Sequence, residues 1–172
     1  MFPDDLVPNR GLLHERLGDG PNLIWRFAVE GDDVGVTAPW YPPAHSSLLA
    51  LVGDARVEFV NLRGQAEDDG VGFSVGADVF TATSVVTLTA SKVGGRDVTW
   101  RVFAVGRSTI SKVEVAATAD AFLAGNSEWP KVRHAVVTFA DGRELALTPN
   151  GQSSRDREEL ADLVLSFVRA LK

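Results

Sequence analysis

The sequence of 172 residues contains no cysteine. This excludes disulfides, thiolate nucleophiles and zinc or iron–sulfur sites built on cysteine. Long apolar runs are also missing, since no window approaches the ~20 residues of a membrane-spanning helix. Residues 1–5 are acidic and polar and lack the basic and apolar regions of a secretory signal peptide. We therefore expect a cytoplasmic protein that is not integral to a membrane.

Basic residues are not in excess, because 17 lysines and arginines face 23 aspartates and glutamates, giving a formal net charge of −6. A nucleic-acid backbone is bound by a basic face, so we do not expect nucleic acid as a partner. Residues 1–70 hold 5 basic and 12 acidic side chains, against 12 and 11 in residues 71–172. Six of the eight prolines lie in residues 1–43. This asymmetry predicts two differently built halves that pack as one structural unit, with a boundary in the polar stretch 64–70.

The N-terminal half is expected to be largely irregular with some β-structure. Prolines limit residues 1–22 to loop and a short helical turn near 12–17. Branched and aromatic side chains in residues 23–29 predict a strand, which returns as a second strand over 34–37.

Prolines dominate the next stretch, residues 38–43, which reads Ala-Pro-Trp-Tyr-Pro-Pro. We expect neither helix nor strand there, because proline lacks the backbone donor and restricts its neighbours. Residues 46–52, closed by Gly53, predict a short helix.

The rest of the chain is predicted to be almost continuously β. Gly94-Gly95 is a two-residue hairpin signal, and Gly106 interrupts a run of alternating residues. Residues 117–132 are expected to be irregular. The predicted strands, in chain order, are 57–62, 71–75, 78–83, 85–92, 98–104 and 110–116.

The clearest pattern closes the chain. Residues 135–139 and 145–147 alternate on either side of Asp141-Gly142, which predicts a β-hairpin. A helix is then predicted over 153–171, begun by a serine cap and acidic residues. Its apolar side chains follow helical spacing and are expected to be buried: Leu160, Leu163, Val164, Phe167, Val168 and Leu171.

About seven short strands followed by one amphipathic helix resemble a bacterial pleckstrin-homology-like (PH-like) domain. The likeness covers residues 71–172 and rests on Val86-Thr87-Leu88-Thr89, on residues 107–115, on residues 137–143 and on the terminal helix. It implies a β-barrel that binds proteins, peptides or lipids, or that oligomerises, and that is not usually catalytic. Fold alone does not fix function.

Two groups of residues are candidates for binding. Trp40 and Tyr41 stand between prolines, where they predict either an exposed recognition element or a strap that pins the N-terminal half. Four basic residues of the C-terminal half would hold an anionic group, such as a carboxylate or a lipid headgroup, if they converged at a barrel mouth. They are Arg107, Lys112, Lys131 and Arg133.

Catalytic and metal signals are weak. No histidine has a second ligand at metal-site spacing, and the acidic pair Asp68-Asp69 lacks the pattern of a calcium loop. The string 72–76 matches Gly-x-Ser-x-Gly, but a nucleophile elbow at Ser74 needs a strand-to-helix turn, and the following residues predict strand. We expect no catalytic residue, metal or cofactor.

Together these patterns predict a mainly β or α+β fold. It is an antiparallel β-barrel or strongly bent sheet capped by a C-terminal amphipathic helix, with an irregular N-terminal β extension. The expected function is a non-catalytic binding or scaffolding domain, with a protein partner or a second copy of the chain. The alternatives are a helix-grip carrier or enzyme with an enclosed apolar cavity, and a structural subunit of a bacterial or phage assembly.

Overall fold

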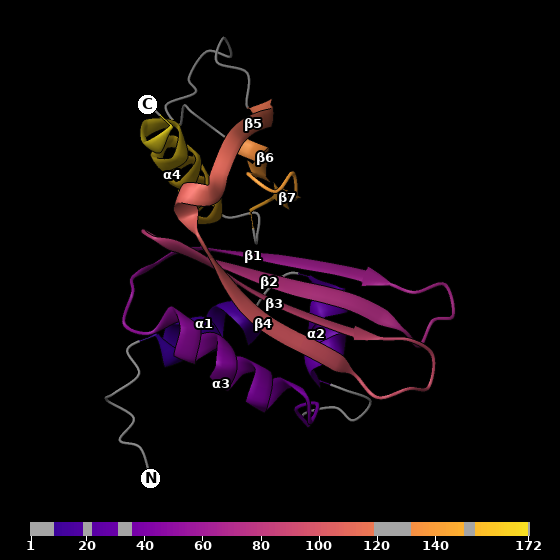
Figure 1. Cartoon of the computed structure of the whole chain (residues 1–172). Coiled ribbons are helices and arrows are strands. Elements are labelled where there is room, and N and C mark those ends of the chain that lie inside the picture. The colour runs from indigo at the N-terminus through magenta and orange to yellow at the C-terminus, as the bar shows by residue number, and fades with distance from the viewer. Residues whose placement is uncertain (1–8, 19–21, 31–35, 119–131, 150–153, 172) are drawn as a thin grey trace. The chain divides into compact units, whose positions relative to one another are not determined.

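The computed structural model describes residues 9–18, 22–30, 36–118, 132–149 and 154–171. The chain divides into two compact units, Met1–Val105 and Gly106–Lys172. Two antiparallel sheets, of four and three strands, and a C-terminal helix confirm the predicted α+β class (Figure 1). The described strands form no single closed barrel. The predicted boundary at 64–70 lies inside the first unit, at the end of its first strand and in the turn that follows.

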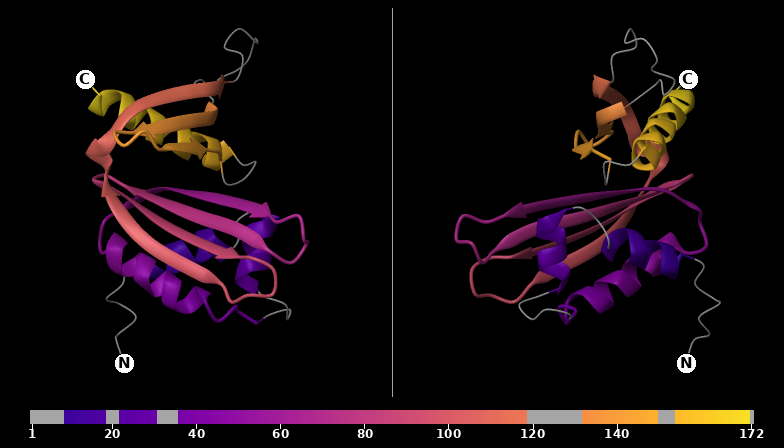
Figure 2. Two further views of the ribbon diagram at one scale, coloured as in Figure 1. Left: turned by 45° about the vertical axis from the view of Figure 1, so that its right-hand side comes forward. Right: turned by 180° about the vertical axis from the view of Figure 1, so that it is seen from behind.

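The first unit is a four-stranded sheet covered on one face by three helices. The helices are α1 (Arg10–Gly18), α2 (Leu23–Glu30) and α3 (Tyr41–Val52). The strands are β1 (Val57–Ala66), β2 (Phe73–Thr81), β3 (Ser84–Lys92) and β4 (Thr99–Gly106), in the order β1-β2-β3-β4. Figure 2 shows from two sides that the three helices lie against the same face of this sheet.

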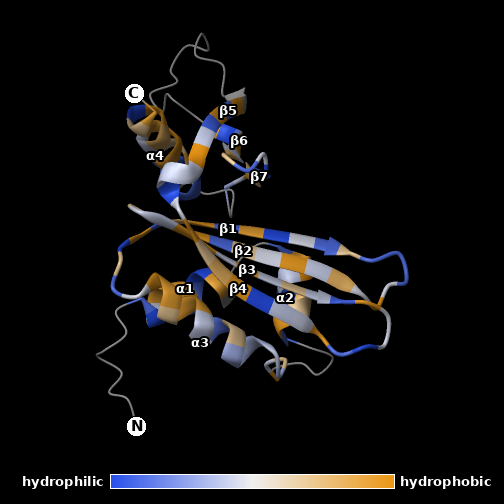
Figure 3. Ribbon diagram, in the orientation of Figure 1, coloured by the Kyte–Doolittle hydropathy of each residue, from blue (hydrophilic) through white to orange (hydrophobic). Residues whose placement is uncertain are grey.

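Alternation gives the sheet an apolar face under the helices and an opposite face, here called the polar face, which is polar except for the buried row of Phe59, Phe80 and Val85. Side chains on the apolar face, including Val60, Ala77, Val79, Val86 and Leu88, join the core with the buried residues of the three helices. The register places different residues on the other face, in rows that cross the strands. One row runs Asn61, Asp78 and Thr87, and the next runs Arg63, Gly76 and Thr89. Figure 3 shows the resulting alternation of hydrophilic and hydrophobic residues along the strands.

The predicted strand over 23–29 is wrong, because these residues form α2. The Asn22 side chain accepts a hydrogen bond from the Trp25 backbone nitrogen (3.0 Å) and so caps the helix. Trp25 and Ala28, three residues apart, are both buried on one side. Helical spacing and a cap therefore outweigh the β-propensity of the side chains. Residues 34–35 of the second predicted strand lie outside the described residues, and Val36 and Thr37 are not in a strand.

The expectation that residues 38–43 contain no helix is also wrong. Helix α3 begins at Tyr41 and carries Pro42 and Pro43 in its first turn. Backbone nitrogens of a first turn have no intrahelical acceptor, so proline is tolerated there. The predicted end at Gly53 is confirmed, since Gly53 adopts φ of 61° and its nitrogen donates to the Leu49 carbonyl (2.8 Å). In its described residues, the predicted N-terminal β extension thus consists of three helices followed by β1.

The second unit is a three-stranded sheet with one helix packed on it. A short 3-10 helix, η2 (Arg107–Thr109), leads into β5 (Ile110–Thr118), which is followed by β6 (Val132–Phe139), β7 (Glu144–Leu147) and α4 (Ser154–Ala170). The order is β5-β6-β7. The predicted terminal hairpin and helix are confirmed. Residues 119–131, most of the predicted irregular stretch, lie outside the described residues.

The core of the second unit lies between α4 and the sheet. Four of the predicted apolar positions are buried: Leu160, Leu163, Val164 and Phe167. Val168 and Leu171, predicted to join them, are about half exposed at the end of the helix.

Candidate functional site

A buried carboxylate organises the polar face of the four-stranded sheet. Asp78, only 1% exposed, accepts hydrogen bonds from Asn61 Nδ2 (3.1 Å) and Thr87 Oγ1 (3.0 Å), its neighbours in the row. Arg63 donates two more, from Nε (2.8 Å) and Nη2 (3.1 Å). Four donors therefore satisfy the carboxylate, which is how a charge is tolerated when it is buried.

Gly76 makes room for this ion pair. It lies opposite Arg63 in the register, and a Cβ at this position would come within 2.7 Å of Nη2 and 2.8 Å of Cζ of Arg63. The guanidinium thus crosses β2 directly over the glycine to reach Asp78. Position 76 therefore requires glycine because any side chain would collide with the Arg63 guanidinium.

The next strands carry a second arginine on the same face. Arg101 of β4 donates from Nε to Thr89 Oγ1 (3.4 Å), which places it in the row of Arg63 and Gly76. Its guanidinium carbon also lies 5.9 Å from the centre of the Phe103 ring. No carboxylate of the described residues forms an ion pair with Arg101. Arg63 is neutralised by Asp78, whereas Arg101 is not.

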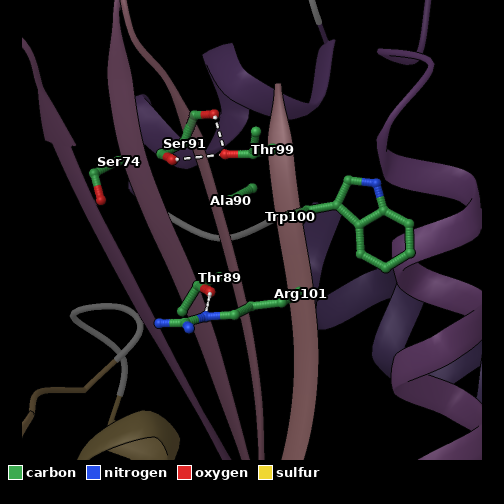
Figure 4. A pocket seen from close by; sticks show the side chains of 7 residues that line it. All are labelled: Ser74, Thr89, Ala90, Ser91, Thr99, Trp100 and Arg101. Carbon is green, nitrogen blue, oxygen red and sulfur yellow. Dashed lines mark hydrogen bonds between the residues drawn. The ribbon is translucent and has the colours of Figure 1, made fainter. Parts of the chain in front are cut away.

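Beside Arg101 lies a hollow of about 430 Å³, here called the polar hollow. Ser91 and Thr99 share a hydrogen bond between their hydroxyls (3.2 Å), and Ser74 stands across from them on β2 (Figure 4). Trp100 points to the opposite side of β4 from Arg101 (Figure 4). The lining residues are Ser74, Thr89, Ala90, Ser91, Thr99, Trp100 and Arg101. The hollow therefore presents hydroxyls and one guanidinium, which donate hydrogen bonds to an anionic or polar group.

The two outer strands of the sheet, β1 and β4, differ in how far their residues are buried. Five of the ten residues of β1 are buried. At Gly64 an added Cβ would lie 2.6 Å from Asn22 Oδ1 and 2.9 Å from Ile24 Cβ, so α2 begins against this strand. Strand β4 is half-buried or exposed at every residue, and Trp100 is 37% exposed. Strand β4 has a neighbouring strand, β3, on one side only among the described residues.

Trp40 and Tyr41 lie in the core of the first unit. Trp40 Nε1 donates to the Ala28 carbonyl (2.9 Å), and the two rings stand edge to face with centres 5.7 Å apart. Burial raises the pKa of Tyr41 to about 12. Both residues are less than a tenth exposed, so neither offers an aromatic surface for a partner to contact. Their contacts join α2 to the start of α3.

The four predicted basic residues make separate local contacts where they are described. The Arg107 guanidinium lies 4.4 Å from the centre of the Phe167 ring and donates to Ser166 Oγ on α4. Lys112 pairs with Glu114 (2.7 Å), whose hydrogen bond and charge raise the pKa of the lysine. Arg133 is exposed on β6, and Lys131 lies outside the described residues. Arg107 and Lys112 are thus each engaged by a neighbour of their own.

The described residues contain no cluster of three or more histidine or acidic side chains that could hold a metal ion. The rings of His14 and His45 are 6.2 Å apart. Burial, and then the charges of His14 and Arg10, lower the pKa of His45. Ser74 lies within β2, as predicted, and not at the strand-to-helix turn that a nucleophile elbow needs.

Sequence reasoning missed the ion pair of Arg63 with Asp78 and did not single out Arg101 as a site residue. The only signal was the alternation of polar residues at every second position, as in Thr87, Thr89 and Ser91, then Thr99 and Arg101. Alternation places such residues on one face of a strand, but the register that brings the strands' polar positions together is not readable from it.

Comparison with protein-family models, with curated proteins and with solved structures gave no match to this chain. In the described part of the chain, the structure has no helix with the length and apolar character needed to cross a membrane. The case for function therefore rests on the geometry of the first sheet.

Proposed function

We propose that this chain is a non-catalytic, cytoplasmic binding domain that associates through the outer strand β4, with the same strand of a second copy as the partner. The observation that carries the proposal is that β4 has no buried residue and that five of its eight residues are exposed. A strand at the edge of a sheet has backbone groups along its outer side with no strand to pair with, and it is a template for addition of another strand.

The composition of β4 favours such pairing. Its sequence, Thr-Trp-Arg-Val-Phe-Ala-Val-Gly, has branched and aromatic residues, a single charge and no proline. Proteins usually protect edge strands with lysine, proline or bulges, or by keeping the strands short. Strand β4 has eight residues with no lysine or proline, and Arg101 is its only charged residue.

The outer strands of the second sheet are better protected. Strand β7 is only four residues long and begins with Glu144. Strand β5 carries Lys112 and Glu114, and its register shifts irregularly against β6. Short, charged or bulged edges disfavour pairing, so we assign the association to β4.

The predicted likeness to bacterial PH-like domains covers residues 71–172. An order of four antiparallel strands, three antiparallel strands and a terminal helix supports such a likeness when β1, which precedes residue 71, is counted with them. The carrier alternative gains less support, since the polar hollow is lined mainly by hydroxyls and a guanidinium rather than by the apolar side chains expected of such a site.

Light scattering after size exclusion tests the proposal directly. We expect the wild-type mass to rise above that of the 18.4 kDa chain as the protein concentration increases. Ala104→Lys places a charge on the exposed edge of β4 and is expected to return the mass to that of one chain. The matched control, Ala146→Lys, makes the same change on the exposed face of β7 and is expected to retain wild-type association.

A wild type that stays monomeric at every concentration contradicts pairing between copies. Equal loss of association in both variants would instead show that added charge alone disperses the protein, and it would remove β4 from the proposal.

A further inference from the structure

Two guanidiniums from opposite strands of the sheet converge on its centre. Arg63 starts on β1 and lies over Gly76 of β2, while Arg101 starts on β4 and reaches Thr89 of β3. Gly76 and Thr89 are directly paired. Because neighbouring strands are about 4.8 Å apart, the two guanidiniums are separated by roughly one strand spacing.

The charges in this row do not cancel. Asp78 offsets one of the two guanidiniums, through Nε and Nη2 of Arg63. Its carboxylate already accepts four hydrogen bonds and is buried, so it has little capacity for Arg101. Nη1 of Arg63 is not used by Asp78, and the Arg63 side chain is 41% exposed. The guanidiniums of Arg63 and Arg101 therefore leave one positive charge that Asp78 does not offset, together with several N–H donors, over the middle of the sheet.

Hydroxyl donors stand next to these guanidiniums in the polar hollow. Thr99 Oγ1 lies within hydrogen-bond distance of both the Ser91 hydroxyl (3.2 Å) and the Ser91 carbonyl (3.5 Å). When Thr99 donates to the Ser91 hydroxyl, the Ser91 proton is left to donate elsewhere. Ser74 lies opposite Ser91 in the register and is exposed. Guanidinium forks together with hydroxyls are the donors that bind oxyanions with several acceptor oxygens.

We propose that the row of Arg63, Gly76, Thr89 and Arg101, with the adjoining polar hollow, is a binding site for the phosphate group of a small molecule. Arg101 is the principal ligand, and Nη1 of Arg63 and the hydroxyls of Thr89 and Ser91 complete the donor set. A tetrahedral dianion offers more acceptor oxygens than a carboxylate and matches this larger set of donors. The remaining volume of the hollow accommodates the rest of an organic phosphate.

Titration of the full chain in phosphate-free buffer tests this site. Calorimetry with inorganic phosphate, glycerol 3-phosphate and acetate measures affinity, and amide chemical shifts locate the binding. We expect both phosphates to bind and to perturb residues of β2, β3 and β4, with acetate at least about tenfold weaker. Tighter binding of glycerol 3-phosphate identifies an organic ester as the ligand, whereas equal affinity identifies the phosphate group alone.

Matched arginine variants decide whether the site is the one described. Arg101→Ala is expected to weaken phosphate binding by about tenfold or more, the effect of losing a charge-assisted hydrogen bond. Arg96→Ala removes the same charge from the exposed β3–β4 turn and is expected to leave affinity unchanged within twofold. Arg101 is exposed, so its variant should fold, and its amide spectrum verifies this.

Three results would overturn the proposal: no phosphate binding by the wild type, equal affinity for acetate and phosphate, or equal losses in Arg101→Ala and Arg96→Ala. The last would mean that phosphate responds only to the overall charge of the hairpin.

Discussion

The two sheets of this chain differ in the face that no helix covers and in their outer strands. Each is antiparallel and has helices on one face, three helices on the first sheet and α4 on the second. The opposite face of the first sheet holds a buried carboxylate under a network of donors, whereas that of the second has the exposed pair of Lys112 and Glu114. The first sheet also ends in a long exposed strand, and the second in short or charged strands. We infer that binding is concentrated on the first sheet.

The largest effect is expected from the helical cover of the first sheet. Trp25 is fully buried and donates from Nε1 to the Leu17 carbonyl (2.6 Å). Trp25→Ala should lower the free energy of unfolding by about 3–5 kcal/mol, measured by chemical denaturation. Leu23→Ala, on the exposed side of the same helix, should change it by less than about 0.5 kcal/mol. Similar losses in both variants would contradict the packing described for α2.

The polar networks of the two sheets provide the next comparison. A double-mutant cycle of Asp78→Asn and Arg63→Ala should give a coupling free energy of about 1–2 kcal/mol, below that of a fully buried pair because Arg63 is partly exposed. The same cycle with Lys112→Ala and Glu114→Ala should give no measurable coupling, since both side chains are more than half exposed. Equal coupling in the two cycles would remove the contrast between the faces.

Glycine substitutions test whether space over the first sheet matters. Gly76→Ala pushes a methyl group into the Arg63 guanidinium and should lower the free energy of unfolding by about 1–2 kcal/mol. Gly106→Ala meets only an ordinary contact, 3.4 Å from Ser108 Oγ, and should have a smaller effect. Urea denaturation compares the two variants. A neutral Gly76→Ala would show that Arg63 does not depend on this close approach.

The smallest expected effect is a change in stability at alkaline pH, which arises from Tyr41 in the first unit. Tyr41 is the single tyrosine, and its pKa is about 12 in the folded protein against 10.0 for an ordinary tyrosine. The protonated phenol thus stabilises the fold fully below pH 10, and this contribution is lost as the pH rises towards 12. Tyrosinate absorbance during titration measures the pKa, with Tyr41→Phe as the blank. Titration near pH 10 would contradict the burial of Tyr41.

Local patterns predicted the second unit better than the helices of the first. Strict alternation around Asp141-Gly142 and a helical stripe around Leu160 point to the structure that is found, because each local preference agrees with the packing. In α2, aromatic and branched residues predict a strand, and the buried positions of Trp25 and Ala28 decide for a helix. The prolines of α3 do not prevent a helix, because they lie in its first turn.

The candidate site was less predictable than the fold. Arg63 and Asp78 are fifteen residues apart in sequence and meet only through the register of β1 and β2. Trp40 and Tyr41 stood out in sequence because they lie between prolines, and the structure uses them to hold α2 and α3 together. Exposure of β4 depends on its place at the end of the strand order, which alternation does not reveal.

Amide hydrogen exchange at low and high protein concentration tests most directly whether β4 is the associating edge. We predict that amides of β4 become more protected at high concentration, while those of β7 keep the same exchange rates. Protection that does not change in β4, or that increases in β7 instead, would contradict the proposal.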